Sequence, residues 1–419
     1  MKLISAFVFL LLIGFSEFQL VKYKNYIVIK AFPNSTRELK ILNSLRSSLK
    51  NLVDFWSSPT HTLTPIIFSV NPSSRRHVLR FLKQQNLNAT VLTNNLQEWI
   101  DREARYVKSR LQAFAGRDES INFETYHPYE MIETILKSQT AKFSAKVIYS
   151  TIGKTYENRN IYAMVIDENP NESKPVVMLE CGIHAREWVS PATCLWISNQ
   201  LLKNSSESEL LQKFSFHIIP VANPDGYVYS WRTNRMWRKN RVPNDFFGFC
   251  RGVDLNRNFG TNFCKTGASP ISCDNSYCGK KAFSEKESQA IRDHVLSIKK
   301  SKLKAFFSVH SFSQFWMYPY GYKDDLAQNH EQYNTLSKLA VDAIRKVHEE
   351  QYQYGSISKI IYKASGNTID WLQENNLSEV SFAIELRDKG YYGFFLPPHL
   401  IRPTAEEFWA GVKAVIQNI

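Results

Sequence analysis

VVMLECGIHAREW, residues 176–188, begins as a short apolar run and ends in charged and aromatic residues. Residues 176–181 predict a buried strand, because a short and mainly apolar run before a glycine is typical of a strand covered on both faces. His184 and Glu187 follow its carboxyl end, and a second run of this kind, residues 305–309, ends at His310. Binding sites of open α/β sheets lie beyond the carboxyl ends of strands. We therefore expect these three side chains to meet.

Two imidazoles and one carboxylate are the protein ligands of many catalytic zinc sites, which leave the fourth position to water. An H-x-x-E pair alone is weak evidence, because polar side chains are mostly exposed. The spacing also differs from the H-E-x-x-H of helical zinc sites, so a turn that presents His184 and Glu187 to a distant His310 fits better. The placement of the three residues at two strand ends predicts a zinc hydrolase.

From residue 118 onward, predicted strands and helices alternate. The predicted strands are residues 146–150, 161–166, 176–181, 215–221, 305–309 and 381–386. Ser284-x-x-Glu287 predicts a capping box that opens a helix reaching about residue 299. This alternation predicts an α/β fold with a mixed, largely parallel twisted sheet and helices on both faces.

The N-terminal part predicts a separate small domain. Strand-like runs at residues 26–29, 66–70 and 89–92 alternate with helical patterns at residues 37–49 and 75–82, which favours a ferredoxin-like α/β sandwich. Residues 95–114 then predict a charged connecting helix. It ends at Ala115-Gly116-Arg117-Asp118, where the glycine stops a helix and the basic residues offer a trypsin-like cleavage point.

Processing and cysteine signals indicate an extracellular protein. One basic residue and a short apolar run predict a signal peptide over residues 1–16, and no later stretch predicts a membrane span. The six cysteines lie between Cys181 and Cys278 and can pair fully, in fifteen possible ways. N-x-S/T sequons are consistent with secretion, and they begin at Asn34, Asn88, Asn171, Asn204 and Asn376.

The positive charge belongs to the N-terminal part. Residues 1–117 hold 17 Lys or Arg against 6 Asp or Glu, which is +11 of the total of +13. A basic domain can bind nucleic acid, but no recognition motif accompanies the charge. We expect a solvated basic surface, of a kind that acidic polysaccharide would retain, and no nucleic acid partner.

Five motifs together resemble the secreted zinc metallocarboxypeptidases of the carboxypeptidase A/B type, and the resemblance covers nearly the whole chain. They are GIHAREW (182–188), NRMWRKNR (234–241), DLNRNF (254–259), HS (310–311) and ELRD (385–388). The resemblance implies one Zn²⁺ held by His184, Glu187 and His310. It also implies a monomer with an inhibitory prodomain at residues 17–117 and a catalytic domain at residues 118–419.

The same resemblance implies activation and covalent links. A trypsin-like protease would cut at Arg117, with Arg110 as second choice. Similarity to the B-type members implies three disulfides, Cys181–Cys194, Cys250–Cys273 and Cys264–Cys278.

Catalytic roles follow from the same matches. Glu385 matches the general base, although a buried lone carboxylate could instead be paired with Arg387 or another basic residue. Arg238 matches the residue that stabilises the developing oxyanion. Asp254 matches the carboxylate that orients the first histidine.

Substrate-binding roles are implied for a second group. Arg257 would clamp the free C-terminal carboxylate of a peptide, with Asn256 beside it and Tyr362 closing over it. Arg186 matches an ancillary substrate position, Arg235 does so with less support, and Ser311 is a further substrate-binding candidate.

In the family that the chain resembles, the residue at the floor of the specificity pocket selects the substrate, and the matching residue here is Ile369. An Asp there would select C-terminal Lys or Arg, whereas Ile predicts aliphatic or aromatic residues. Further apolar or small pocket positions are Met317, Ile357, Ile361, Ala364 and Ala383. Asp370 matches a residue found in both A-type and B-type enzymes, so it does not favour either specificity.

Two departures from the family pattern bear on substrate binding. Asn367 replaces a common Gly and could narrow the pocket, and Phe312 replaces a common Tyr and removes a hydroxyl. Two alternatives stay open: a B-type enzyme, favoured by the cysteine pattern, and an inactive binding protein of the same fold. The second is opposed by the presence of every expected site residue.

Overall fold

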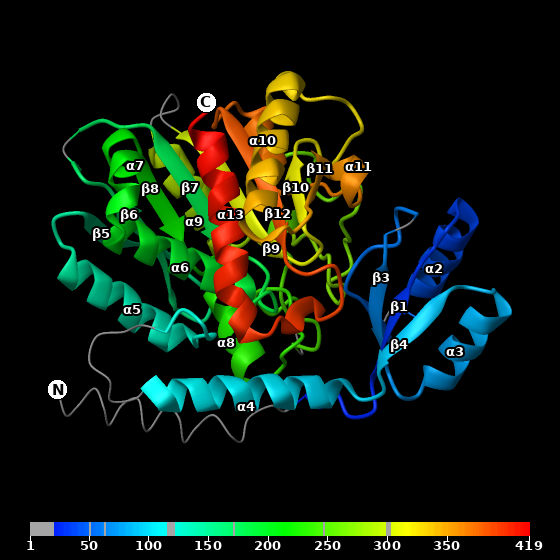
Figure 1. Cartoon of the computed structure of the whole chain (residues 1–419). Helices are drawn as coiled ribbons and strands as arrows, with labels where there is room; N and C mark the ends of the chain where they lie inside the picture. Colours follow the sequence, from blue (N-terminus) through cyan, green and yellow to red (C-terminus); the bar gives the residue numbers. More distant parts are fainter. Residues whose placement is uncertain are drawn as a thin grey trace.

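The computed structural model describes residues 21–49, 52–62, 64–114, 122–170, 172–245, 248–298 and 303–419 (Figure 1). The predicted signal peptide, the predicted cleavage residue Arg117 and the sequon residue Asn171 lie outside these ranges. Within them, no helix is long and apolar enough to cross a bilayer.

The N-terminal domain has the predicted ferredoxin-like arrangement. Its antiparallel sheet has the order β2-β3-β1-β4. The elements follow one another as β1 (Ile27–Ala31), α2 (Thr36–Ser48), β2 (Val53–Phe55), β3 (Ile66–Val70), α3 (Arg75–Gln84) and β4 (Ala89–Thr93). Ser35 caps α2 by accepting the backbone N–H of Glu38. Both helices lie on the side of this sheet that faces away from the larger domain (Figure 1).

The larger domain is built on one eight-stranded mixed sheet, as predicted, in the order β11-β10-β12-β9-β7-β8-β6-β5. Its strands are β5 (Val147–Lys154), β6 (Asn160–Ile166), β7 (Val176–Cys181), β8 (Ser215–Ile219), β9 (Leu303–Ser311), β10 (Phe315–Tyr318), β11 (Gln353–Ser356) and β12 (Val380–Leu386). The central strands β8, β7, β9 and β12 are parallel. Strands β5, β6 and β10 pair antiparallel with their inner neighbours.

Helices cover both faces of this sheet. One face packs against α5 (Tyr129–Lys142), α6 (Val189–Lys203), α7 (Ser208–Lys213), α10 (His330–His348) and α13 (Ile401–Ile416). The other packs against α9 (Lys286–Ser297), α11 (Ile357–Ile360) and α12 (Thr368–Glu374), and α8 (Pro224–Arg232) follows β8. Alternate residues of each strand face opposite layers, so Phe307 joins the first core and Phe306 the second.

The predicted capping box at α9 is wrong. The residue before the helix is Glu285, and the Ser284 hydroxyl donates to the Glu285 carboxylate instead of capping the helix. Asn258, remote in sequence, accepts the Glu285 backbone N–H at 3.2 Å. A tertiary contact therefore replaces the local cap.

The two domains are joined by α4 (Leu96–Phe114), which runs beside the larger domain (Figure 1), and by a shared apolar cluster. The smaller domain and α4 contribute Val28, Trp56, Ile67, Leu96 and Ile100, and the larger domain contributes Met236, Phe312, Phe394 and Phe395. Trp56 packs on Phe394 with ring centroids 5.5 Å apart.

Candidate active site

His184, Glu187 and His310 converge as the sequence predicts. The first two lie in the turn between β7 and α6, and His310 lies near the end of β9. All three are buried, and one ligand atom from each lies within 4.8 Å of the others. His184 Nδ1 is 2.9 Å from Glu187 Oε1, and His310 Nδ1 is 3.2 Å from Glu187 Oε2.

The donor set fits a zinc ion. The Nδ1 atoms of His184 and His310 face each other at 3.1 Å. Two nitrogens bound tetrahedrally at about 2.0–2.1 Å would lie at a similar separation. Burial opposes ionisation of Glu187, yet His184 and His310 hold its pKa below the ordinary range, so the site keeps an anionic ligand.

Asp254 and Arg238 support the first histidine. Asp254 lies directly before the short helix η2 (Leu255–Arg257) and is fully buried. Its Oδ1 is 3.1 Å from His184 Nε2, and its Oδ2 accepts Arg238 Nη2 at 2.9 Å. Although burial opposes the shift, Arg238, Arg257 and His184 hold the pKa of Asp254 well below its usual range. Asp254 is therefore an anion that orients His184.

Glu385 is next to the ligands on the neighbouring strand. The register pairs it with His310, and it lines the same cavity as His184 and Arg238. Burial and the Glu187 carboxylate raise the pKa of Glu385 well above its usual range, against the Arg238 guanidinium. Arg387 bonds to Glu407 rather than to Glu385. The salt-bridge alternative with Arg387 is therefore wrong.

The predicted carboxylate clamp forms a second group at the cavity. The Arg257 guanidinium lies with its Nη2 3.3 Å from the Tyr362 hydroxyl, while its Nη1 donates to the Asn256 carbonyl at 2.8 Å. Asn256 accepts the backbone N–H of Thr368 at 3.1 Å through its side-chain oxygen. Arg257, Asn256 and Tyr362 all line the cavity.

The remaining cavity wall is largely apolar. Met317, Ile357, Ile361, Ala364 and Ala383 line it together with Asn367. Ile369 is fully buried in the same apolar cluster and does not itself line the cavity. The backbone N–H of Ser311 donates to Glu187 Oε2 at 3.3 Å, so Ser311 contacts a proposed zinc ligand.

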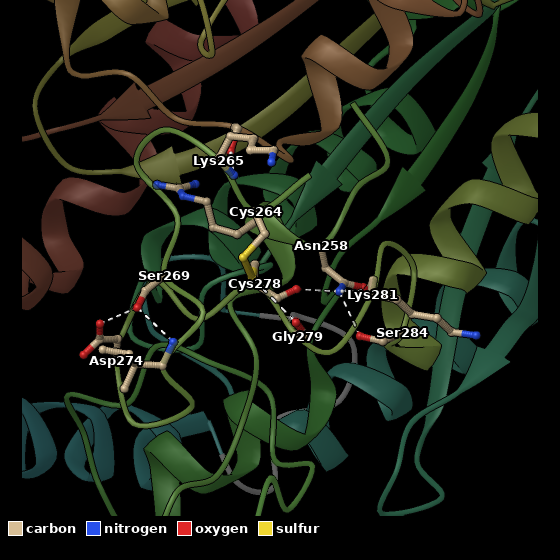
Figure 2. Close-up of a disulfide and its surroundings, with 12 residues drawn as sticks. Asn258, Cys264, Lys265, Ser269, Asp274, Cys278, Gly279, Lys281 and Ser284 are labelled. Atoms are coloured by element: carbon tan, nitrogen blue, oxygen red, sulfur yellow. Dashed lines mark hydrogen bonds between the residues drawn. A yellow bond between two sulfur atoms is a disulfide. The ribbon is translucent and has the colours of Figure 1, made fainter. Parts of the chain in front are cut away.

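The loop that carries Arg257 is braced by disulfides and by Asn258. The three bonded pairs are Cys181–Cys194, Cys250–Cys273 and Cys264–Cys278. Beside the third pair, Asn258 Nδ2 donates to the carbonyls of Cys278 and Lys281 at 2.7 and 3.1 Å and to Ser284 Oγ at 2.9 Å (Figure 2). These contacts tie the arginine-bearing loop to the segment that leads into α9.

The smaller domain and α4 engage two arginines that the sequence assigns to substrate positions. Arg186 Nη1 is 3.0 Å from Asp54 Oδ2, and the fully buried Arg235 forms two hydrogen bonds with Glu103 on α4. The hydroxyl of Thr60 donates to the Ile361 carbonyl, beside the cavity. Sequence reasoning missed Asp54 and Glu103, because nothing local distinguishes these carboxylates from solvated ones.

Comparison with known proteins agrees with this geometry. Residues 132–411 match the family model described as zinc carboxypeptidase, and residues 29–103 match that of the carboxypeptidase activation peptide. The chain is 36% identical to carboxypeptidase A2 of Mus musculus, covering 94% of this chain and 93% of the relative. It is 37% identical to carboxypeptidase B of Bos taurus, with the same two coverages.

Solved structures give the same result. The crystal structure of thrombin activatable fibrinolysis inhibitor superposes with a TM-score of 0.84 at 33% identity, covering 95% of this chain and 100% of that one. Carboxypeptidase A from Helicoverpa armigera superposes with a TM-score of 0.86 at 29% identity, covering 94% of this chain and 97% of that one. Because its catalytic domain and its N-terminal activation peptide both match, this chain belongs to the zinc carboxypeptidase family.

Proposed function

We propose that this chain is a secreted zymogen whose activated form releases aliphatic or aromatic residues from the C-termini of peptides and proteins. The observation that carries the specificity is the apolar cavity wall, formed by Met317, Ile357, Ile361, Ala364 and Ala383 beside the zinc ligands. Among the described lining residues, the only carboxylate is Glu385. A pocket for Lys or Arg would need another.

In this proposal His184, Glu187 and His310 hold the zinc ion. Bound zinc supplies Lewis-acid polarisation of the scissile carbonyl and makes a water more acidic. Glu385 takes the proton of the attacking water and passes it to the leaving amine. Glu385 lines the same cavity as His184 and His310, which places its carboxyl beside the metal position.

Two arginines act on different parts of the substrate: Arg238 on the scissile carbonyl and Arg257 on the terminal carboxylate. Arg238 lies within 3.2 Å of His184 Nδ1 and so stands where negative charge develops on the carbonyl oxygen. Arg257, Asn256 and Tyr362 bind the free carboxylate, which restricts the reaction to chain ends. Ser311 and Arg186 contribute to the surrounding substrate surface.

The precursor state is supported by the contacts of the smaller domain. We propose domain limits of 1–16 for a signal peptide, 17–117 for the inhibitory prodomain and 118–419 for the catalytic domain. Cleavage by a trypsin-like protease at Arg117 would release the enzyme. Arg110 is a poorer choice, because it lies within α4, where a helix resists entry into a protease cleft.

A B-type specificity is the second candidate, favoured by the relatives of both types. Asp370 adjoins Ile369, but its carboxylate accepts the backbone N–H groups of Gly321 and Tyr322 and the Asn367 amide, and it is fully buried. It is therefore not available to a cationic substrate side chain.

One assay tests these proposals together. The purified precursor is treated with trypsin and given peptides that end in Phe, Leu, Lys or Glu, with and without a zinc chelator. We expect chelator-sensitive release of Phe and Leu. Absence of any release would refute the enzymatic proposal, and preference for Lys would refute the argument from the cavity wall.

A further inference from the structure

Glu180 is a fully buried carboxyl for which the reaction described above has no use. It lies on β7, one residue before Cys181, and neither of its oxygens has a hydrogen bond of ordinary geometry among the described residues, although the Ser308 hydroxyl is close enough to lower its pKa. Burying a carboxyl group without a partner costs several kcal/mol. The residues beside Glu180 indicate which interaction offsets this cost.

The sheet places Glu180 beside Ser308 and close to His310. The parallel ladder between β7 and β9 pairs Glu180 with Ser308. His310 is two residues farther along β9, so its side chain leaves the same face of the sheet. Ser308 Oγ lies 3.0 Å from His310 Nε2. Burial raises the pKa of Glu180 to about 7, while His310 and the Ser308 hydroxyl oppose the rise.

The direction of hydrogen bonding follows from the zinc-binding tautomer. His310 turns Nδ1 toward His184 and Glu187, so Nε2 must carry the proton when Nδ1 binds metal. The Asn256 amide nitrogen is 3.3 Å from Nε2 but is itself a donor. Ser308 Oγ is the available acceptor, and its own hydroxyl hydrogen is then left to donate to a neighbouring group.

His184 offers a direct comparison. Its Nε2 faces the carboxylate of Asp254 at 3.1 Å, while its Nδ1 faces the metal position. A carboxylate behind a metal-binding histidine fixes the tautomer and makes the ring a better ligand. Among the residues that the structure describes, no carboxylate contacts His310 Nε2, but Glu180 lies one hydroxyl away.

We propose that Glu180 is a positioning residue for the zinc ligand His310 and acts through the Ser308 hydroxyl. The relay runs from His310 Nε2–H to Ser308 Oγ, and from the Ser308 hydroxyl to the Glu180 carboxylate. Glu180 touches neither substrate nor metal, and its contribution is to hold the ring and its tautomer. The inference rests on His310 being a zinc ligand, as proposed above.

A double-mutant cycle on the full precursor tests the relay. Glu180→Gln, Ser308→Ala and the double variant are compared for their zinc dissociation constant, measured by competition with a chromophoric chelator. We expect each single change to weaken zinc binding by about tenfold or more. The double variant should bind no more weakly than Ser308→Ala alone, because residues in one chain of contacts are not additive.

Two controls separate positioning from general stability. Glu287→Gln alters another fully buried carboxyl, whose partner is Asn240, and should leave zinc binding unchanged. Ser308→Thr keeps the hydroxyl and should retain native zinc binding. Thermal unfolding with and without zinc adds a second measurement. Glu180→Gln and Ser308→Ala should each lose part of the stabilisation that zinc provides. The loss should be about 1.4 kcal/mol for a tenfold increase in the zinc dissociation constant.

The inference is overturned if Glu180→Gln binds zinc like the native precursor. It is also overturned if the two single effects simply add, or if the apo and zinc-loaded forms lose stability equally. If Glu180→Gln does not fold, the Ser308→Ala and Ser308→Thr pair decides the role of the hydroxyl. A native precursor that binds no zinc would instead refute the proposed function.

Discussion

The pair formed by Glu103 and Arg235 offers a sharp test of how the prodomain is held. Arg235 is fully buried, and its Nε and Nη2 lie 2.5 and 3.0 Å from the two carboxylate oxygens of Glu103. Burial raises the pKa of Glu103 even beside this guanidinium, so the pair costs much desolvation. The change Glu103→Gln leaves a buried cation without its counter-ion.

Removing one member of a buried ion pair costs about 3–5 kcal/mol. Arg235 keeps hydrogen bonds to the carbonyls of Arg186 and Phe394, and glutamine can still accept one bond. We therefore expect a cost at or below the lower end of this range, about 2–3 kcal/mol of docking free energy. At about 1.4 kcal/mol per tenfold, the undocked population rises by roughly 30-fold to 150-fold.

The assay is peptide hydrolysis by uncut precursor in the presence of a trypsin inhibitor. Because the undocked form exposes the cavity, activity should rise by the same factor. Asp54→Asn is the matched control, because Asp54 is 30% exposed in its side chain and its pair with Arg186 should be worth about 1 kcal/mol at most. Equal effects of the two changes, or a folded Glu103→Gln precursor with native latency, would refute the reasoning.

Three further predictions concern catalysis, specificity and pH. Glu385→Gln should lower kcat of the activated enzyme by about 10²–10⁴-fold while zinc content, measured by atomic emission, stays at one ion per chain; native turnover would exclude Glu385 as the base. Ile369→Asp places a carboxylate in the apolar cluster behind the cavity wall and should shift release from Phe toward Lys in paired peptide assays, and an unchanged ratio would place the pocket floor elsewhere. Burial and His294 lower the pKa of His217 to about 3, so the folded state favours the neutral ring. The stability this gives is present above pH 6.5 and is lost as the pH falls toward 3, by at most about 1.4 kcal/mol per pH unit. Urea unfolding at pH 7 and 4.5 should show a smaller difference in His217→Phe than in the native protein, and an equal difference would contradict this origin.

Local patterns predict the central elements well. The apolar run at residues 176–181 coincides with β7, because burial on both faces requires apolar residues throughout. By contrast, β10 and β11 are four residues each, and β11 begins with the exposed Gln353. Their identity as strands depends on pairing with each other and with β12, which no single segment encodes.

The residues of the candidate site also differ in how well the sequence predicts them. His184 and Glu187 share one turn, and a known motif locates the other expected residues. In the sequence, Glu103 is one of several charged residues in a predicted helix and nothing distinguishes it from the others. It is buried because α4 packs against the larger domain. Glu180 sits in an apolar run, where sequence alone cannot name Ser308 as its neighbour.

The position of the cysteines has a consequence for activation. All six lie between residues 181 and 278, and all six are bonded within the larger domain. One cut in the connecting segment therefore leaves two chains with no covalent link. Before the cut, the tether keeps the prodomain at an effective concentration on the order of millimolar. Afterwards, release becomes a dissociation equilibrium, so the activity that follows cleavage should depend on how far the cut protein is diluted.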